Sequence, residues 1–353
     1  MAETMKAWQF TTHGPITKTL RLATDVPRPE AASLQPGQVL VKVASAGLNP
    51  VDYKMPELGL AARAIFSFPK IPCGDLSGTA VATGEGVEGL AAGDHVVGWL
   101  NPFGSAGALS EYAVLDKESW LRLGDGADLD EAAGALTTGL TALQSIQPYV
   151  KAGDRVFING GSGGTGTHGI QIAKLLGCHV TVSCSTAKVD FCRGLGADEV
   201  IDYKKEDVVA SLVKQGASAG AEKWALIVDN IGNSPTDLYK RSHEVLREGG
   251  VYAYVGGRMS AGSVWNILRG RLLPGFLGGQ RRRFVLVMAQ QSTEYVSQIV
   301  TWIAEGKLRT VVDSKYGFGQ VKEAYERLKT DRCQGKVIVK VVGGEQYGER
   351  LGK

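Results

Sequence analysis

The chain has 353 residues, which is more than one hydrophobic core usually supports, so two domains are expected. Its 44% hydrophobic and 21% charged residues indicate a globular protein and argue against a disordered one. The net charge of +3 is too small to suggest nucleic-acid binding. The five cysteines contain no CxxC pair, so neither a disulfide scaffold nor a zinc ribbon is indicated, and a reducing compartment is expected.

The first 125 residues are typical of short strands separated by turns. Strands are expected over 39–44, 79–82 and 95–99, each beside glycine-containing turns. The N-terminus reaches an acidic residue at once and has no apolar stretch, so no secretory signal is expected. A soluble, cytoplasmic protein is the default expectation.

An acidic N-cap near Asp128 opens helical segments over 132–136 and 141–146, and strands then alternate with helices of about ten residues. The expected strands are 155–159, 179–183, 199–201, 225–228 and 251–255, and the expected helices between them are 169–176 and 188–195. This alternation predicts right-handed crossovers and a doubly wound parallel sheet. The tail predicts helices over 293–305 and 321–329 and a closing strand over 336–342. The fold class is therefore α/β, with a nucleotide-binding domain of residues 127–270 inserted into a mainly β domain formed by residues 1–126 and 271–353.

A glycine-rich loop lies directly after the strand 155–159 and directly before a helix. Gly161, Gly163 and Gly166 satisfy G-x-G-x-x-G, the dinucleotide fingerprint of a Rossmann domain, in the strand–loop–helix context that it requires. Helix N-terminal amides would face the phosphates of the cofactor. The predicted cofactor-binding residues of the loop are Gly161, Ser162, Gly163, Gly164, Thr165 and Gly166.

The same loop also matches G-x-S-x-G, the nucleophile elbow of serine hydrolases, with Ser162 as nucleophile. Asp229 and His243 follow in hydrolase order. No HGGG-like oxyanion segment precedes the serine, and Gly166 would have no role. The hydrolase interpretation is kept as a remote alternative.

The end of the second strand of the nucleotide-binding domain distinguishes NAD from NADP. An NAD site carries Asp or Glu there to bind the ribose 2′-hydroxyl. This chain has Ser185 and Lys188 instead, with no carboxylate before Asp190. Hydroxyls and a lysine suit a 2′-phosphate, so NADPH is the predicted cofactor.

Further segments extend the pattern over the whole chain: GLNPVDYK (47–54), GDLSG (74–78), GLTA (139–142), LGADEVIDY (195–203) and GKVIV (335–339). With the glycine loop, they resemble the medium-chain dehydrogenase/reductase superfamily, in its zinc-independent quinone oxidoreductase branch. Residues 179–184 and 310–315 look most like plant chloroplast-envelope homologues. The resemblance implies a GroES-like domain beside the Rossmann domain, and allows a peripheral location at the chloroplast envelope.

The resemblance also implies roles for individual residues. Lys54 and Tyr53 are candidate proton donors to the substrate carbonyl, with solvent as the alternative, and Asn49 positions the nicotinamide or its own segment. Lys54 is also expected to contact the cofactor. The remaining implied cofactor-binding residues are Thr141, Tyr203, Asn230, Ile231, Val255, Gly256, Gly257, Phe284, Val285, Leu286 and Lys336.

No metal is predicted. Zinc-dependent relatives carry a cysteine near the position of Asn49 and Gly-His-Glu where this chain has Gly74, Asp75 and Leu76. Cys73 has no His or Cys partner at ligand spacing, which favours a small buried side chain.

Residues 251–293 contain six arginines and no Asp or Glu, interleaved with apolar residues around Pro274. Two interpretations stay open: a basic, apolar flap that contacts an amphiphilic substrate or an anionic membrane surface, or a solvated face beside the edge strand of a homodimer. Taken together, the sequence predicts an NADPH-dependent, zinc-independent reductase of enones, oxylipin ketols or quinones. The alternative is a non-enzymatic NADPH-binding protein of crystallin or redox-sensor type.

Overall fold

The computed structural model describes residues 3–64, 67–218, 220, 222–232, 238–256, 281–290 and 292–341. The chain forms two compact units: residues 1–138 with 291–353, and residues 139–290. Both boundaries lie later than the expected ones at 126/127 and 270/271. The helix α3 (Leu129–Ala133) packs on the first unit, where a Cβ on Gly47 would lie 2.1 Å from the Ala133 carbonyl oxygen. At the other end, β13 (Arg283–Leu286) pairs with β12 and extends the sheet of the second unit.

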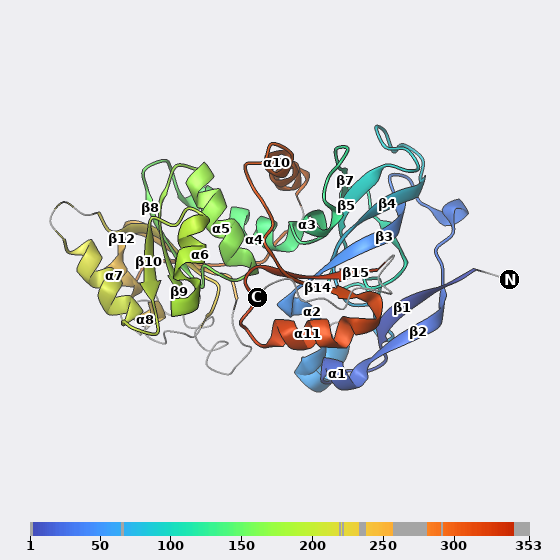
Figure 1. The fold of residues 1–353 in the computed structure, drawn as a ribbon, viewed down its shortest axis with the longest axis horizontal. Helices are drawn as coiled ribbons and strands as arrows, with labels where there is room; N and C mark the ends of the chain where they lie inside the picture. Colours follow the sequence, from blue (N-terminus) through green and yellow to red (C-terminus); the bar gives the residue numbers. More distant parts are fainter. Residues whose placement is uncertain are drawn as a thin grey trace. The chain divides into compact units, whose positions relative to one another are not determined.

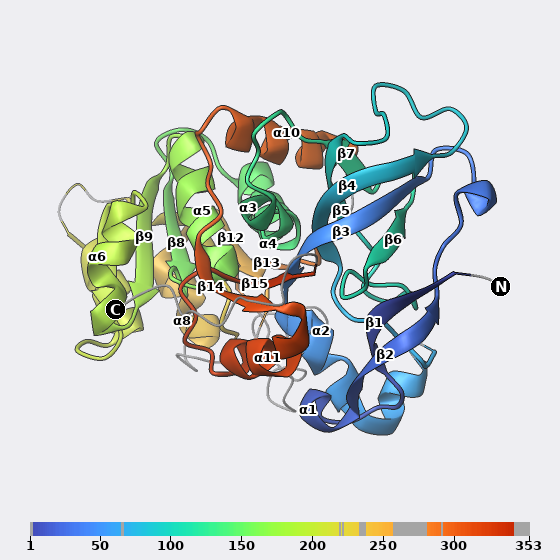
Figure 2. The same cartoon turned by 45° about the vertical axis from the view of Figure 1, so that its right-hand side comes forward.

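The first unit is built around a seven-stranded sheet, drawn for much of its length in Figure 2. The strand order is β14-β15-β3-β4-β5-β7, with β6 pairing with β3, and all pairs are antiparallel except β14 with β15. The strands are β3 (Val39–Leu48), β4 (Asp75–Thr83), β5 (His95–Trp99), β6 (Tyr112–Leu115), β7 (Trp120–Arg122), β14 (Val312–Gly317) and β15 (Lys336–Lys340). A separate hairpin joins β1 (Thr4–Phe10) and β2 (Leu20–Pro27). The expected mainly β domain is therefore confirmed.

The first unit also contains several helices besides α3. They are α1 (Ile16–Thr19), η1 (Ala31–Ser33), α2 (Pro50–Lys54), η2 (Pro56–Ala64), α10 (Thr293–Ala304), η6 (Phe318–Gln320) and α11 (Val321–Lys329). The apolar residues of α11 recur at helical spacing and enter the core of the unit through Val321, Ala324, Tyr325 and Leu328. The other face of α11 is tied to β14, because Arg327 donates two hydrogen bonds to Asp313 at 2.8 and 2.7 Å.

The second unit contains a six-stranded, fully parallel sheet of order β10-β9-β8-β11-β12-β13. Its strands are β8 (Arg155–Asn159), β9 (His179–Cys184), β10 (Glu199–Asp202), β11 (Trp224–Asp229), β12 (Leu246–Tyr254) and β13. Numbered along the chain, this is the order 3-2-1-4-5-6 of a doubly wound dinucleotide-binding fold. The parallel sheet expected from the sequence is confirmed.

Helices cover both faces of this sheet. The helices α5 (Gly164–Leu175) and α6 (Val189–Gly194) lie on one side and α7 (Val208–Gly216) and α8 (Leu238–Val245) on the other (Figure 1). The chain enters the unit along α4 (Leu136–Ile146), followed by η3 (Gln147–Tyr149), and η4 (Thr186–Lys188) follows β9. Because both faces are covered, every residue of β11 is buried, as is usual for a central parallel strand.

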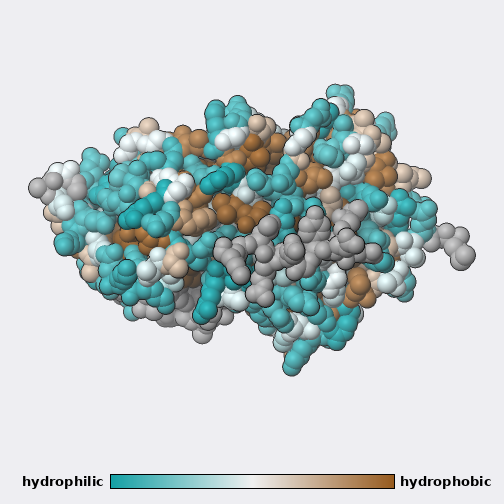
Figure 3. Space-filling model, viewed as in Figure 1, coloured by the Kyte–Doolittle hydropathy of each residue, from teal (hydrophilic) through white to brown (hydrophobic). Residues whose placement is uncertain are grey.

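The surface in Figure 3 is mostly hydrophilic, with hydrophobic patches between the polar areas. Several large apolar side chains are exposed in the described residues, among them Leu60 (74%) and Met288 (61%). Scattered exposed apolar residues are common on soluble domains. In the part of the chain that the structure describes, no helix combines the length and the apolar character needed to span a bilayer.

Candidate active site and cofactor site

Three of the loop glycines are required by the local backbone. Gly160 has a φ of +82°, a conformation that favours glycine. A Cβ on Gly161 would lie 2.8 Å from the Cβ of Val182 in β9, and a Cβ on Gly166 would lie 2.2 Å from the Gly160 carbonyl oxygen. Glycine at these positions therefore permits the tight strand-to-helix turn and the close approach of α5 to the loop.

Gly163 differs from these neighbours because no atom of the described residues would crowd a side chain at this position. It is the N-cap residue of α5, and the nearest atom to a Cβ placed on it is the Gly160 carbonyl oxygen, 3.9 Å away. The free space lies at the N-terminus of a twelve-residue helix, where the backbone N–H groups and the helix dipole favour an anion. This is the position at which the dinucleotide fingerprint needs room for a pyrophosphate. The loop therefore fits a dinucleotide.

The carboxyl ends of the strands beside the loop are joined by a buried polar network. Asp229 accepts from the Asn159 amide at 2.8 Å and from the Tyr252 hydroxyl at 2.6 Å. Ser183 in turn donates to Asn159 at 2.6 Å, which links β9 to β8. Burial raises the pKa of Asp229 although these donors act against the shift. The network fixes the strand ends that carry the loop.

The same network argues against the hydrolase interpretation. Asp229 also accepts from the backbone N–H groups of Ile231 and Gly232, so its carboxylate is committed to the strand ends. The His243 ring contacts the Lys240 carbonyl instead. No hydrogen bond joins Ser162, His243 and Asp229 anywhere in the described residues.

Asn230 is the clearest unmatched polar group at this edge of the sheet. Both amide atoms of its side chain are buried and have no hydrogen-bond partner among the described residues. Such groups are rare because a buried unpaired amide is costly. The next residue, Ile231, is 43% exposed and lies against Gly160 of the loop. The sequence predicted that both residues bind the cofactor. The unpaired amide of Asn230 and the exposed side chain of Ile231 are both available to contact a ligand.

Ser185 and Lys188 lie in the turn that follows β9. Ser185 is the N-cap residue of η4, and the Lys188 N–H donates to its carbonyl oxygen at 2.8 Å. Tyr203, which directly follows the neighbouring strand β10, is 50% exposed, and the Lys204 ammonium lies 5.3 Å from the centre of its ring. The three predicted residues thus follow two adjacent strand ends.

Sequence reasoning missed one carboxylate in this region. Asp202 ends β10 and pairs in register with Cys184 of β9, so it lies beside the Ser185 turn. A hydrogen bond from the Thr186 side chain lowers the pKa of Asp202. The chain spacing that marks an NAD site does not include Asp202, because Asp202 comes beside the Ser185 turn only through the pairing of β10 with β9.

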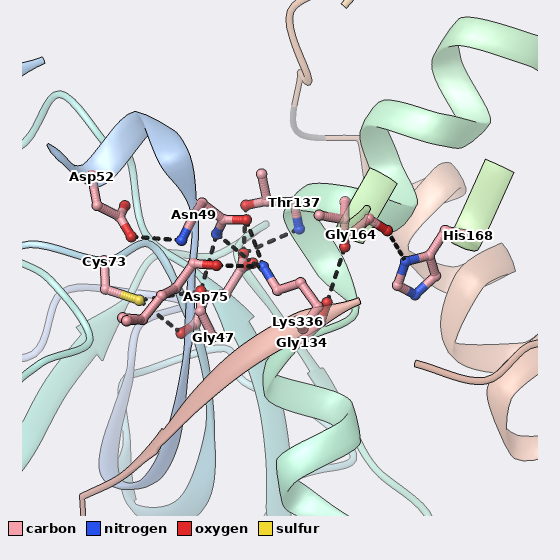
Figure 4. A network of polar contacts seen from close by, with 12 residues as sticks. Gly47, Asn49, Asp52, Cys73, Asp75, Gly134, Thr137, Gly164, His168 and Lys336 are labelled. Carbon is pink, nitrogen blue, oxygen red and sulfur yellow. Dashed lines mark hydrogen bonds and ion pairs between the residues drawn. The ribbon is translucent and has the colours of Figure 1, made fainter. Parts of the chain in front are cut away.

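In the first unit, Asn49, Asp75 and Lys336 form a buried network (Figure 4). The Lys336 ammonium lies 2.5 Å from the Asn49 side-chain oxygen, 3.0 Å from the Leu48 carbonyl and 3.5 Å from Asp75. Asn49 donates to Asp75 at 2.8 Å, and Thr137 donates to the other Asp75 oxygen through its backbone and its hydroxyl. Lys336 is only 2% exposed, and its hydrogen bond to the Asn49 side-chain oxygen holds Asn49 in place. Cofactor binding by Lys336 stays a prediction.

This donor set does not fit zinc. The oxygens of Asn49 and Asp75 already surround a lysine ammonium, and zinc prefers cysteine sulfur and histidine nitrogen. Cys73 is buried, which raises the pKa of its thiol, and it donates weakly to the Gly47 and Asp75 carbonyls. Within the described ranges, no group of three or more His, Cys, Asp and Glu side chains could hold a metal ion.

The helix α2 presents the candidate proton donors. It begins at Pro50 with Asn49 as its N-cap, and the Asn49 N–H donates to Asp52 at 2.8 Å, as in a capping box. Burial raises the pKa of Asp52 to about 7, and the Tyr325 hydroxyl of α11 donates to it at 3.3 Å. Tyr53 and Lys54 follow at the end of the helix, with Tyr53 6% exposed and Lys54 half-buried.

The Tyr53 ring packs against a cation. The Lys329 ammonium of α11 lies 5.2 Å from the centre of the ring and also pairs with Glu57. A cation–π contact at this distance contributes about 0.5–2 kcal/mol. No sequence pattern predicts this contact, because 276 positions separate the two residues.

The remaining predicted residues belong to the second unit. Thr141 is buried in α4, Val255 and Gly256 follow β12, and Phe284, Val285 and Leu286 form most of β13. The rings of Phe284 and Tyr252 stack with centres 6.0 Å apart, so Phe284 helps to pack the sheet. Gly257 and three of the six arginines (Arg258, Arg269 and Arg271) lie outside the described residues. Of the others, Arg283 lies 5.4 Å from the Tyr149 ring centre.

Comparison with protein families finds two matches along the chain. Residues 35–125 match the alcohol dehydrogenase GroES-like domain, and residues 195–339 match the zinc-binding dehydrogenase family. The first falls within the β unit described above. The second spans most of the parallel sheet and the C-terminal elements.

Relatives match over nearly the whole length. The chain is 44% identical over 352 residues to the trans-enoyl reductase pgmF of Aspergillus terreus, covering 96% of each protein. It is 29% identical to an NADPH-dependent alkenal/one oxidoreductase of Arabidopsis thaliana, covering 95% of this chain and 79% of that one. A solved quinone oxidoreductase of Coxiella burnetii superposes with a TM-score of 0.80 at 29% identity, over 96% of this chain and 100% of the other. The chain therefore belongs to the medium-chain dehydrogenase/reductase superfamily, in the branch that contains quinone oxidoreductases and alkenal/one oxidoreductases, and it is an oxidoreductase.

Proposed function

We propose that this oxidoreductase is an NADPH-dependent, zinc-independent reductase of activated double bonds, acting on enones or quinones. The observation that carries the proposal is the glycine loop, where a Cβ on Gly163 at a helix N-terminus would be crowded by no described atom, its nearest neighbour being the Gly160 carbonyl oxygen at 3.9 Å. The unpaired amide of Asn230 supports it independently, because it provides a buried donor and acceptor at the carboxyl edge of the same sheet.

The residues present suit a dinucleotide. The N–H groups of Gly163, Gly164 and Thr165 would bind the pyrophosphate, and Asn230 would bind the cofactor further along the sheet edge. Ser185, Lys188 and Tyr203 would bind the adenosine ribose and its 2′-phosphate, for which a lysine supplies charge. When bound, NADPH supplies the hydride that is added to the electrophilic carbon of the substrate.

The chain itself would contribute a proton donor and would hold the segment that carries this donor in place. Hydride addition to an enone leaves negative charge on the carbonyl oxygen, and a donor near that oxygen stabilises it. We assign this role to Lys54 and Tyr53, with water as the alternative source of the proton. Asn49, held by Lys336 and Asp75, would position the segment that carries both donors.

The substrate class rests on the relatives. A trans-enoyl reductase at 44% identity favours a carbon–carbon double bond conjugated to a carbonyl group. The quinone oxidoreductase structure keeps quinones as the second candidate, since a quinone presents the same conjugated carbonyl.

The direct test is NADPH oxidation by the purified chain with a panel of short enones, long enones and quinones. We expect turnover with at least one class, and a product whose double bond is reduced. Cofactor binding without turnover on the whole panel would favour the non-enzymatic alternative of a crystallin-like or sensor protein. Hydrolysis of esters that is lost in Ser162→Ala would favour the hydrolase.

Cofactor choice is tested separately with Lys188→Ala. We expect the wild type to prefer NADPH over NADH by at least tenfold in kcat/KM, which corresponds to about 1.4 kcal/mol. The substitution should reduce this preference through the KM for NADPH and leave the NADH parameters nearly unchanged. Equal use of both cofactors by the wild type would contradict the assignment, and Asp202 would then be the carboxylate to examine.

A homodimer, a cytoplasmic location and peripheral contact with an anionic membrane also remain proposals. Sedimentation of the purified chain tests the first. Flotation with anionic liposomes at low and high salt tests the last, and Gln substitutions at Arg281, Arg282 and Arg283 should weaken it, because the attraction is electrostatic.

A further inference from the structure

The helix α11 lies beside α2 in both Figure 1 and Figure 2, although the two segments are far apart in the sequence. Two consecutive residues of α2, Asp52 and Tyr53, contact two residues of α11 that are one helical turn apart. Tyr325 donates to Asp52 at 3.3 Å, and the Lys329 ammonium lies 5.2 Å from the centre of the Tyr53 ring. Residues at i and i+4 share one face of a helix, so a single face of α11 makes both contacts.

The helix α11 is itself firmly held. Tyr325 is fully buried in the core of the first unit, and Val321 and Ala324 beside it are equally inaccessible. On the side of α11 that faces away from α2, Arg327 forms a bidentate ion pair with Asp313 of β14. An element fixed at both faces can transmit its position to a shorter element that rests on it.

The helix α2 depends on outside contacts because it is only five residues long. Its first turn is closed by the Asn49–Asp52 capping box, and the buried Asp52 has its second partner in α11. An isolated helix of this length is not stable in water, so tertiary contacts decide where it lies.

We propose that α11 positions the proton-donating segment, with Lys329 and Tyr325 as positioning residues that fix α2 and thereby Tyr53 and Lys54. This inference rests on the proposed function, because it assigns the role of these residues in that same reaction. Neither Lys329 nor Tyr325 needs to touch substrate. Each acts through the residue of α2 that it contacts.

The kinetic test compares full-length variants in enone reduction with NADPH. Lys329→Gln removes the cation from the Tyr53 ring, and Lys329→Arg keeps it. We expect Lys329→Gln to lower kcat about fivefold with the KM for NADPH within twofold of wild type, and Lys329→Arg to recover most of the loss. Tyr325→Phe keeps the buried ring and removes the hydroxyl, and should lower kcat about threefold.

Two controls separate this role from general stabilisation. Glu57→Gln removes the negative charge that pairs with Lys329 and leaves the ring contact, so kcat should stay near wild type. Lys42→Gln removes an equal charge from an exposed position of β3 in the same unit and should have no effect. In a Tyr53→Leu background, which lacks the ring, Lys329→Gln should cause no further loss of kcat.

Unchanged kcat in Lys329→Gln would overturn the inference, as would full activity of Tyr53→Leu or independent, multiplying losses in the double variant. A wild type without enone or quinone turnover would instead refute the proposed function. The inference is then decided by chemical unfolding: a double-mutant cycle of Lys329→Gln with Tyr53→Leu should show coupling, and additive effects would overturn it.

Discussion

Gly163 shows how a single missing side chain can indicate a ligand. The three neighbouring loop glycines are explained by backbone conformation or by contacts under 3 Å, and Gly163 is explained by neither. A residue kept free of a side chain where the protein leaves space is best explained by something that approaches its backbone.

Gly163→Val should therefore keep the fold and lose the cofactor. The added side chain would fill the space at the α5 N-terminus without a close protein neighbour, so the thermal midpoint should stay within a few degrees of wild type. NADPH affinity, measured by calorimetry, should fall at least tenfold. Gly194→Val, where a Cβ would meet no described atom within 4 Å, is the control in the same unit. Undiminished NADPH binding by Gly163→Val would contradict the site.

Asp52 predicts a pH dependence of stability. Its pKa rises from 3.8 to about 7 because burial disfavours the carboxylate, so the folded state holds the proton more tightly than the unfolded state. The stabilisation is complete below about pH 4 and is lost as the pH rises through about 7. Asp52→Asn keeps an acceptor for Asn49 and cannot ionise, so its stability should fall less than that of wild type over this window.

Urea unfolding at several pH values between 4 and 8 measures this difference. Burial lowers the pKa of Lys70 to about 8, so the folded state favours its neutral form. The titration of Lys70 therefore makes the folded state more stable as the pH rises above about 8, which is outside this range and opposite in direction to the effect of Asp52. Asp25→Asn, at an exposed position of β2, controls for the loss of one carboxylate. Parallel profiles for wild type and Asp52→Asn would rule out the assignment.

At the scale of elements, local patterns predicted much of the secondary structure. The expected strands at 95–99 and 155–159 became β5 and β8 with the expected limits, and the expected helix near 321–329 became α11. The helix α5 begins five residues earlier than expected, because its first turn consists of glycine and threonine residues that are weak helix formers in isolation. Tertiary contacts there override the local propensity.

The candidate site was less accessible to sequence reasoning. The glycine loop and the strand-end residues could be found because each follows its own strand in the chain. The partners of Asn49 could not, since Asp75, Thr137 and Lys336 come from three distant segments and meet only in the folded sheet. Asp202 was missed for the same reason, because strand pairing and not chain spacing brings it beside the Ser185 turn.

Asp130 of α3 illustrates how elements are joined by charge. One of its oxygens accepts from Lys340 of β15 and from Ser45 of β3, and the other pairs with Lys315 of β14 at 2.6 Å. These partners hold the pKa of Asp130 below its usual range although burial acts against them. One carboxylate thus connects α3 to three strands of the first unit.

Asp130→Ala should destabilise the first unit by about 2 kcal/mol, because two partly exposed lysines lose a shared partner. Since the folded-state pKa is depressed, the contribution is present above about pH 4 and is lost as the pH falls through the folded-state value. The difference between wild type and variant should therefore be larger at pH 7 than at pH 3. Chemical denaturation at both values measures it, and an equal difference at both would show that packing, not charge, carries the effect.

At the scale of the whole molecule, the two units divide the proposed function between them. The parallel sheet supplies a doubly wound scaffold whose strand ends carry the dinucleotide site, and the β unit supplies the buried network behind α2. Each unit has its own core, so their contributions can be perturbed separately. A variant of the loop should affect cofactor affinity, and a variant of the Lys336 network should affect turnover.

The proposed zinc independence predicts how the activity of the protein responds when metal is removed or added. A zinc dehydrogenase uses its metal to stabilise the oxyanion, but here the ammonium of Lys336 occupies the space between the Asn49 and Asp75 oxygens. A second cation among the same oxygens would be repelled by the buried ammonium, and it would find no thiolate or imidazole set in the described residues. We therefore expect activity to survive prolonged treatment with EDTA or phenanthroline, and elemental analysis to give far less than one zinc per chain. Adding zinc should not raise kcat. A ratio near one zinc per chain, together with loss of turnover on chelation that zinc restores, would show that the oxyanion is stabilised by a metal and not by donors from α2.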